Sequence, residues 1–328
     1  MTADPKKTVL VTGAAGFIGS HLCESLLEEG WTVYGADKLD DYYPAELKIQ
    51  QIAPSLTKLS FSFEVIDLGD AVATHRYAAK IPRPDVVVHL AAVAGVRLSV
   101  TDPARYVRAN LVATQNVLDA WSREAKVPLV FASSSSVYGN NSRPPFSEDE
   151  PCIEPPSPYA ATKRGAELLC HVAHLIHAAP ITSLRFFTVY GRRQRPDLAI
   201  RKFSTAILRD KEVTVFGDGS MARDFTHVSD IVRGIRSAMN ETSGYRTVNL
   251  GNSAPCSVND LVAKLGKALG KAPRVRLVDR PAGEMNATFA DVRRAASLWG
   301  WKPEVPLDDG LADFARWLEV EERAGRNP

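Results

Sequence analysis

The sequence predicts an α/β protein, with a doubly wound Rossmann-type parallel sheet and a smaller, discontinuous C-terminal lobe. Three observations favour this fold class. Short apolar runs alternate with helical patterns through the first half, a glycine-rich turn follows the first run, and the pattern changes after about residue 190. Strands that alternate with helices pair in parallel, because each crossover helix packs on a face of the sheet. We therefore expect a sheet domain over residues 1–190 and a second lobe formed mainly by residues 191–328.

The first half contains six apolar runs of strand length. They are Thr8–Thr12, Thr32–Ala36, Phe61–Val65, Val86–Leu90, Leu129–Ala132 and Ile181–Arg185. Helical periodicity predicts helices over Phe17–Glu29, Pro103–Glu124 and Tyr159–His177. The stretch from 143 to 158 has too many prolines for a helix or a central strand. We expect it to be an ordered loop, with Ser157 as the cap of the helix that follows.

Beyond residue 190, basic residues become frequent and strands are interspersed with loops. Strands are predicted at Val213–Phe216 and Arg274–Val278, while Thr247–Leu250 is expected to return to the main sheet near residues 247–251. Ligands of open α/β sheets bind beyond the carboxyl ends of the strands. The cleft between the two lobes is therefore the expected active site.

The composition is that of an ordinary globular protein. The 40 basic and 38 acidic residues leave a net charge of +2, which gives no electrostatic reason to expect nucleic acid or a membrane as a partner. No apolar run approaches the ~18 residues that span a bilayer, and the first strand begins too early for a signal peptide. The cysteines form no CxxC pair, and His171, His174 and His177 drift around a helix, so no metal is expected. We expect a cytoplasmic protein.

A glycine-rich turn follows the first strand and opens the first helix. Gly13, Gly16 and Gly19 let the backbone approach a diphosphate, whose charge then lies at the helix N-terminus. The second strand ends at Asp37, where a carboxylate binds both ribose hydroxyls and repels a 2′-phosphate. These residues predict a bound dinucleotide, NAD rather than NADP, although the neighbouring Lys38 would tolerate the phosphate.

A tyrosine and a lysine four residues apart, Tyr159 and Lys163, lie on one face of a predicted helix. A free phenol has a pKa near 10, and an ammonium group beside it favours the phenolate, which can take a proton from a substrate hydroxyl. The serine run from 133 to 136 ends the preceding strand and supplies a hydroxyl to the same oxygen. Tyr159, Lys163, Ser134 and Ser136 therefore predict an enzyme that oxidises an alcohol, such as a sugar hydroxyl.

Five segments resemble the extended short-chain dehydrogenases/reductases, and among them the NAD-dependent nucleotide-sugar epimerase/dehydratase family. They are TGAAGFIG (12–19), HLAA (89–92), SSSSVYG (133–139), YAATK (159–163), and RDF with the HV that follows (223–228). The resemblance implies that Tyr159 is the base, Lys163 holds the nicotinamide ribose and Ser134 assists. Ser136 is expected to face the same pocket, because strand side chains alternate. The resemblance also implies a homodimer formed through helices.

Five further residues complete the expected cofactor site. Asp67 and Leu68, at the end of the third strand, are placed to hold the adenine edge, with a surface turn as the alternative. The resemblance adds Phe17, Ile18 and Ala91, which belong to its first two motifs.

Three segments narrow the choice among the reactions of this family. Dehydratases of the family carry Asp-Glu after the catalytic hydroxyl, and UDP-glucuronate decarboxylases carry a glutamate at the second position, whereas this chain has Ser135 and Ser136. The segments AGVRLS (94–99) and LRFFTVYG (184–191), the latter followed by Arg195, resemble UDP-glucuronate 4-epimerases. The resemblance implies conversion of UDP-glucuronate to UDP-galacturonate through a transient 4-keto intermediate, with Tyr159 as base.

A UDP-sugar with a 5-carboxylate needs donors that match its charge. Arg97 and Arg195 are candidates for this group, with neutral hydrogen bonds from Thr188 and Ser136; solvent-exposed arginines are the alternative. The resemblance implies that Arg223, Arg280 and Glu284 bind the nucleotide end, and Phe216 is expected to pack on the uracil.

Other activities use the same residues. They are 4-epimerisation of neutral UDP-glucose or UDP-N-acetylglucosamine, decarboxylation of UDP-glucuronate to a UDP-pentose, and net dehydrogenation or reduction with release of NADH. A structural protein that only senses NAD is disfavoured by the complete set of serine, tyrosine and lysine.

Overall fold

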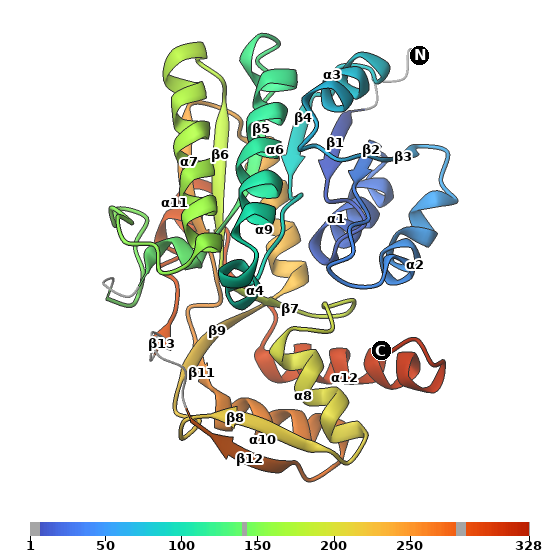
Figure 1. Ribbon diagram of the computed structural model, residues 1–328, viewed down its shortest axis with the longest axis vertical. Helices are drawn as coiled ribbons and strands as arrows, with labels where there is room; N and C mark the ends of the chain where they lie inside the picture. The colour runs from blue at the N-terminus through green and yellow to red at the C-terminus, as the bar shows by residue number, and fades with distance from the viewer. Residues whose placement is uncertain (1–6, 140–142, 280–286, 328) are drawn as a thin grey trace. The chain divides into compact units, whose positions relative to one another are not determined.

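The computed structural model describes residues 7–139, 143–279 and 287–327 (Figure 1). Its strands are β1 Thr8–Thr12, β2 Thr32–Asp37, β3 Phe61–Val65, β4 Val86–His89, β5 Leu129–Ser134, β6 Ile181–Phe186, β7 Thr188–Tyr190, β8 Glu212–Phe216, β9 Ala222–His227, β10 Tyr245–Leu250, β11 Pro255–Ser257, β12 Arg274–Val278 and β13 Ala287–Thr288. Its α-helices are α1 Phe17–Glu28, α2 Ala45–Leu56, α3 Ala71–Lys80, α4 Val96–Thr101, α5 Pro103–Tyr106, α6 Ala113–Val117, α7 Pro158–His177, α8 Ala199–Leu208, α9 Val228–Asn240, α10 Val258–Leu269, α11 Arg293–Trp299 and α12 Leu307–Arg323. The remaining helical stretches are the π-helical η1 Val107–Val112 and η2 Leu118–Arg123, and the 3₁₀ turn η3 Ser135–Tyr138.

Seven strands form the central sheet, in the order β10-β6-β5-β4-β1-β2-β3. β1 pairs in parallel with both β2 and β4, so that Val9 lies opposite Val33 on one side and Val86 on the other. The chain runs outward from β1 to β3 and then returns to the other side of β1 as β4. A ligand of such a sheet binds beyond the carboxyl ends of the strands where their order reverses, which here is between β1 and β4. The predicted Rossmann-type fold is confirmed.

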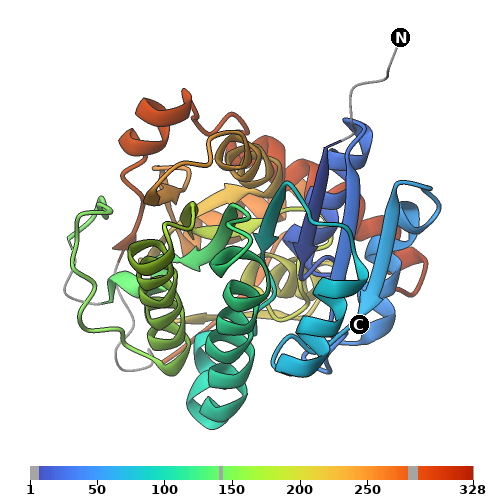
Figure 2. The same ribbon diagram turned by 90° about the horizontal axis from the view of Figure 1, so that it is seen from above.

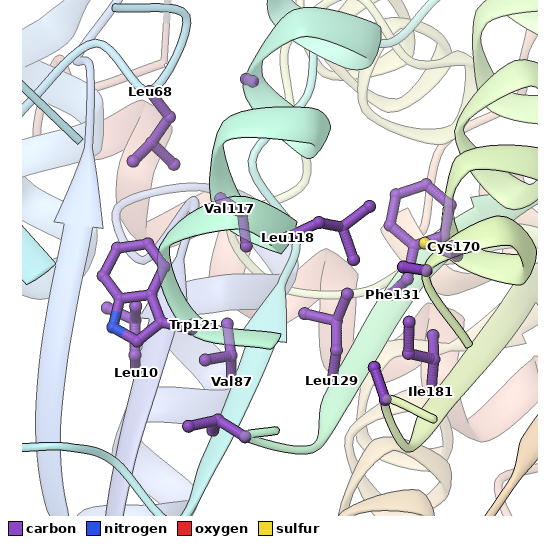
Figure 3. Packing of buried hydrophobic residues seen from close by; sticks show 14 of the residues in the cluster. Leu10, Leu68, Val87, Val117, Leu118, Trp121, Leu129, Phe131, Cys170 and Ile181 are labelled. Carbon is purple, nitrogen blue, oxygen red and sulfur yellow. The ribbon is translucent and has the colours of Figure 1, made fainter. Parts of the chain in front are cut away.

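One face of this sheet is covered by α3, α6, η2 and α7 (Figures 1 and 2). Their apolar side chains form one buried core with those of the strands. Each fully buried Leu or Val stabilises the fold by about 1.5–3 kcal/mol, so this core fixes α7 on the strands beneath it. Figure 3 shows the packing of Leu10, Leu68, Val87, Val117, Leu118, Trp121, Leu129, Phe131, Cys170 and Ile181.

Several elements of the sheet domain differ from the sequence prediction by one residue at an end, and two differ in ways that concern the site. β5 runs on to Ser134, two residues beyond the predicted Ala132, so the serine itself ends the strand. The helix predicted over Pro103–Glu124 is one helical stretch in which π-helical turns alternate with α-helix. Hydrophobic periodicity does not distinguish the two, because single π turns change the spacing of the buried face only locally. The N-terminus of α7 is as predicted, since Ser157 caps it by accepting a hydrogen bond of 3.2 Å from the N–H of Ala160.

The chain divides into two compact units. The first comprises Met1–Gly139, Pro151–Arg185 and Val232–Val248, and the second comprises Asn140–Glu150, Phe186–Ile231 and Asn249–Pro328. β10, which begins in the first unit, lies beside β6 at the edge of the central sheet. The division of labour expected on either side of residue 190, cofactor before it and nucleotide sugar mainly after it, stays a prediction.

The second unit has its own sheets and its own core. β9 pairs with β11, β13 and β7, and β12 pairs with β8. The buried carboxylate of Asp224 on β9 accepts hydrogen bonds from the N–H groups of Asn252 (2.7 Å), Ser253 (3.0 Å) and Ala290 (3.0 Å). Two otherwise separate loops of this unit are thereby held on β9.

No helix in the described part of the chain combines the length and the apolar character that a membrane-spanning helix needs. The described His, Cys, Asp and Glu residues nowhere form a group of three that could bind a metal ion. All four cysteines are buried thiols.

Candidate active site

The glycine turn after β1 has a shape that requires glycine. Gly13 has φ +70°, and a Cβ at this residue would lie 2.8 Å from the backbone nitrogen of Ala91, which follows β4. A Cβ on Gly19 would collide with the carbonyl oxygen of Gly13. The turn is thus packed against the segment after β4, at the place where the strand order reverses. The residues expected here from distant parts of the sequence, Gly13 and Ala91, lie together.

Helix α1 starts directly from this turn. Gly16 is its N-cap and has no side chain to cap it. The first N–H groups of a helix lack an acceptor within the helix, which for α1 includes those of Phe17 and Ile18. Such groups, with the positive end of the helix dipole, bind phosphate. The turn therefore fits the diphosphate of a dinucleotide.

Asp37, the last residue of β2, is anchored to the same turn. One carboxylate oxygen accepts a hydrogen bond from the N–H of Ala15 (3.1 Å) and the other from the N–H of Leu39 (2.8 Å). Burial raises the pKa of Asp37, against the lowering effect of these hydrogen bonds. A carboxylate can accept about four hydrogen bonds, so two of its positions are left for ribose hydroxyls. The predicted NAD site is therefore sterically and chemically consistent with the residues present.

The predicted adenine edge is more crowded. The Asp67 carboxylate pairs with Lys38 (3.1 Å) and Arg108 (3.0 Å), and the Leu68 carbonyl accepts from the Asn116 amide (2.7 Å). Although partial burial raises the pKa of Asp67, the N–H of Gly69 and the two cations hold it below its ordinary value. An adenine amino group would share these oxygens with their present donors. The adenine contact stays a prediction, and Lys38 is an ion-pair partner of Asp67.

The two predicted serines lie side by side, but for a different reason than expected. Ser134 ends β5, and the chain then turns into η3, so Ser136 does not follow the alternation of a strand. The Ser136 N–H donates to the Ser134 hydroxyl (3.2 Å), and the two hydroxyl oxygens are 3.2 Å apart. A tight turn, not strand geometry, brings these hydroxyls together at the carboxyl end of β5.

Helix α7 carries Tyr159 and Lys163. The Lys163 side chain is 4% exposed, and its Nζ donates a hydrogen bond of 2.7 Å to the carbonyl oxygen of Ala132, two residues before Ser134. Burial lowers the pKa of Lys163 to about 8, so the ammonium form is retained at neutral pH. The half-buried ring of Tyr159 meets that of Tyr106 edge to face, with 6.1 Å between centroids. The structure thus ties the lysine to the serine strand through the backbone.

Sequence reasoning missed two buried polar residues that support this site. Asn110 in η1 is 1% exposed; its amide bonds to both backbone groups of Val93 and to the Thr162 hydroxyl, at 2.9–3.0 Å. It joins the segment after β4 to the helix that carries Tyr159. The signal was available, because i,i+4 spacing places Asn110 on the same helix face as the buried Tyr106 and Thr114.

The second is His89, at the end of β4. Its ring bonds to the hydroxyls of Thr12 (2.7 Å) and Thr114 (3.1 Å) and so joins β1, β4 and α6. Burial and the nearby Lys163 lower the pKa of His89 to about 3. This histidine is therefore neutral and structural.

The predicted substrate residues fall in both units. Arg97 is an exposed residue of α4 in the first unit. In the second unit, Thr188 of β7 lies opposite Phe225 of β9, and the Arg195 guanidinium bonds to both carboxylate oxygens of Asp197 (3.0 and 2.9 Å). Phe216 ends β8, and Arg223 of β9 donates to the carbonyl of Ala222 (2.8 Å). Arg280 and Glu284 lie outside the described residues.

Comparison with known proteins agrees with the fold and with these motifs. The model of the NAD dependent epimerase/dehydratase family matches residues 9–251. The UDP-glucuronate 4-epimerase of Thermodesulfobacterium geofontis is 39% identical over 94% of this chain and 95% of its own. The structure of UDP-glucuronic acid 4-epimerase from Bacillus cereus, in complex with UDP-glucuronic acid and NAD, is 38% identical and superposes with a TM-score of 0.88, over 95% of this chain and 99% of that one. UDP-glucose 4-epimerase from Thermotoga maritima, with UDP-glucose, is 30% identical with a TM-score of 0.86, over 96% and 99%. The chain therefore belongs to the NAD-dependent epimerase/dehydratase family.

Proposed function

We propose that this protein is an NAD-dependent UDP-glucuronate 4-epimerase, an isomerase that interconverts UDP-glucuronate and UDP-galacturonate through a transient 4-keto sugar. The observation that carries the proposal is similarity over nearly the whole chain to proteins of that name. The UDP-glucuronate 4-epimerase of Thermodesulfobacterium geofontis is 39% identical to this chain, against 30% for the UDP-glucose 4-epimerase. The serine pair and the tyrosine–lysine helix in the first unit supply the chemistry that such a reaction needs.

Bound NAD supplies the hydride acceptor for oxidation of C4 and the donor for its reduction on the other face. Tyr159 removes the proton of the 4-hydroxyl during oxidation and returns it during reduction. The Lys163 ammonium, fixed by its hydrogen bond to Ala132, favours the phenolate form of the base. Ser134 and Ser136 donate hydrogen bonds to the same region, where charge develops on the oxygen.

The 5-carboxylate sets this reaction apart from that of a neutral sugar. The 4-keto form of a glucuronate is a β-keto acid. It loses CO2 when the C–C bond to its carboxylate is aligned with the π system of the ketone. We propose that Arg195 binds this carboxylate, and that Thr188, Ser136 and Arg97 donate further hydrogen bonds to it. For the nucleotide end we propose Phe216, Arg223, Arg280 and Glu284.

A homodimer is part of the proposal. The outer face of α7 exposes four apolar side chains whose spacing puts them on one stripe. They are Leu168 (48% exposed), Val172 (47%), Leu175 (66%) and Ile176 (68%). An apolar stripe of this kind on a stable helix marks an interface, and two copies related by a two-fold axis bury it against itself. Sedimentation of Leu175→Glu beside the parent protein tests this, since the charge should yield monomers.

The four buried thiols support a reducing location, and we propose the cytoplasm.

The proposed activity is tested by incubating the purified protein with UDP-glucuronate and no added NAD, and resolving the products by NMR. UDP-galacturonate without release of CO2 or NADH is the expected result. A UDP-pentose or UDP-4-keto-pentose as main product would make the protein a decarboxylase. Turnover of UDP-glucose or UDP-N-acetylglucosamine alone would make it an epimerase of neutral sugars, and accumulation of NADH would make it a net dehydrogenase.

A further inference from the structure

A buried carboxylate on the catalytic helix α7, that of Glu167, has no part in the mechanism above. The Glu167 side chain of α7 is fully buried and accepts hydrogen bonds from Ser133 Oγ (2.6 Å), Arg185 Nε (2.8 Å) and Nη2 (2.9 Å), and Arg164 Nη1 (3.0 Å). Arg185, on β6, is itself 2% exposed. Burial of two charges is costly, and only several good hydrogen bonds offset it. The Glu167 carboxylate has such a set.

The partners of Glu167 place it next to the reacting groups. Ser133 directly precedes Ser134 on β5, and Glu167 is four residues after Lys163, on the same face of α7. The backbone carbonyl of Glu167 also accepts a hydrogen bond of 3.2 Å from the Tyr245 hydroxyl of β10. Three strands therefore bind α7 at this one residue. The position of α7 along β5 sets the separation of Tyr159 from Ser134.

We propose that Glu167 is a positioning residue for proton transfer, which holds α7 in register with the serine strand and supplies the negative charge that keeps Lys163 protonated. The proposal rests on the proposed function, because it gives Tyr159 and Lys163 the roles of base and cation.

A comparison of the groups around Lys163 shows which of them carries the negative charge. β5 contributes the Ala132 carbonyl and the Phe131 ring, β4 contributes His89, and α7 contributes Cys170 and Glu167. His89 is neutral, since its pKa is lowered to about 3, and burial raises the pKa of the Cys170 thiol, which is neutral as well.

Glu167 itself stays ionised. Burial alone would raise its pKa, but the hydrogen bonds from Arg185, Ser133 and Arg164 hold it below the ordinary value. Of the described groups that face Lys163, Glu167 is the one that is anionic at neutral pH. Its charge opposes the burial that lowers the pKa of Lys163 to about 8.

The test compares Glu167→Gln with Glu167→Asp in the otherwise intact protein. Two quantities are measured against pH. The first is kcat for UDP-glucuronate, and the second is the NMR signal of the Lys163 side chain in protein with labelled lysine. The Lys163 signal is assigned by its loss in Lys163→Met. In Glu167→Gln, Lys163 should lose its proton at lower pH than in the parent, and kcat in the alkaline range should fall roughly tenfold. Glu167→Asp keeps the charge, so its lysine titration should match the parent although kcat falls because of the shorter side chain.

Glu167→Gln leaves the buried Arg185 without its anionic partner, and such a loss is strongly destabilising. A second variant therefore keeps the test decisive even where Glu167→Gln does not fold. The double variant Glu167→Gln/Arg185→Met removes both charges, a replacement that buried pairs tolerate, and should change the Lys163 titration in the same direction by a smaller amount. Equal loss of kcat in the Gln and Asp variants, with unchanged lysine titration, would overturn the proposal and leave Glu167 a purely structural residue. A parent protein without turnover of UDP-glucuronate would refute the proposed function, while the lysine titration would still decide the role of Glu167.

Discussion

Lys163 reaches from α7 to β5 and donates a 2.7 Å hydrogen bond to the carbonyl oxygen of Ala132. A backbone acceptor on the strand that ends in Ser134 thus fixes the cation that we propose serves Tyr159. Because the acceptor is backbone, this link does not depend on the residue at position 132. What varies with conditions is the proton of Lys163.

The pH dependence of kcat should therefore have an alkaline limb set by Lys163. Burial lowers the pKa of this lysine to about 8, so the cation is present below that pH and is lost above it. We expect kcat to be retained toward neutral pH and to fall as pH rises through about 8. Lys163→Arg, whose guanidinium does not lose its proton in this range, should have a lower kcat without this limb. The pH profiles of kcat for both proteins check the prediction, which an identical alkaline limb in Lys163→Arg would refute.

Gly13→Ala should lower both the stability of the fold and the amount of NAD that the protein retains. The φ of +70° is unfavourable for alanine, and its Cβ would lie 2.8 Å from the nitrogen of Ala91. Gly30→Ala is the matched control, since Gly30 has φ +84° but no neighbour within 4 Å of the added Cβ. The strain alone costs about 1–2 kcal/mol, and this is the expected loss in Gly30→Ala with NAD content unchanged.

Gly13→Ala should lose more stability than this control and should be purified with little NAD. Thermal unfolding and the cofactor content of the purified proteins measure both effects. Equal stability and equal NAD content in the two variants would show that the close approach to Ala91 is unimportant.

Asp37→Ala should weaken the binding of NAD and reduce the preference for NAD over NADP. Loss of a charged acceptor for the ribose hydroxyls costs about 1.5–3 kcal/mol, roughly tenfold to a hundredfold in Kd, and the repulsion of a 2′-phosphate disappears with the carboxylate. Asp41→Ala is the control, because the side chain of Asp41 is 91% exposed. The ratio of the Kd values for NADP and NAD is the decisive quantity, since unfolding of the turn would weaken both alike. An unchanged ratio would remove Asp37 from the ribose site.

The sequence was sufficient for the six strands of the first half and for the helices that carry the motifs, because these depend on local patterns. The glycine turn, Ser157 as a cap, and the i,i+4 pair Tyr159 and Lys163 are of this kind. The contacts of Glu167 with Arg185 depend instead on how α7 docks on β6, which no local pattern encodes. The same limit explains why Ser136 was assigned to a strand, since the turn at Ser134 has no glycine or proline to mark it.

Arg195 is another residue whose predicted role differs from its present contacts. Its guanidinium is held by both oxygens of Asp197, at 3.0 and 2.9 Å, in the arrangement that a substrate carboxylate would need. Arg195→Met should raise KM for UDP-glucuronate roughly tenfold or more, as expected for the loss of a charged hydrogen bond. It should also raise the share of UDP-4-keto-pentose, because the β-keto acid is less well held. Product ratios by NMR and initial rates measure the two effects.

Arg192→Met is the matched control for this prediction. Arg192 lies three residues before Arg195, and its guanidinium is likewise paired with a carboxylate, that of Asp313. Loss of an exposed ion pair as such should change stability by less than about 1 kcal/mol and leave the products unchanged. If both variants gave the same KM and the same product ratio as the parent, Arg195 would be a surface residue that binds Asp197 and not the sugar. A rise in by-product confined to Arg195→Met would instead assign the sugar carboxylate to Arg195.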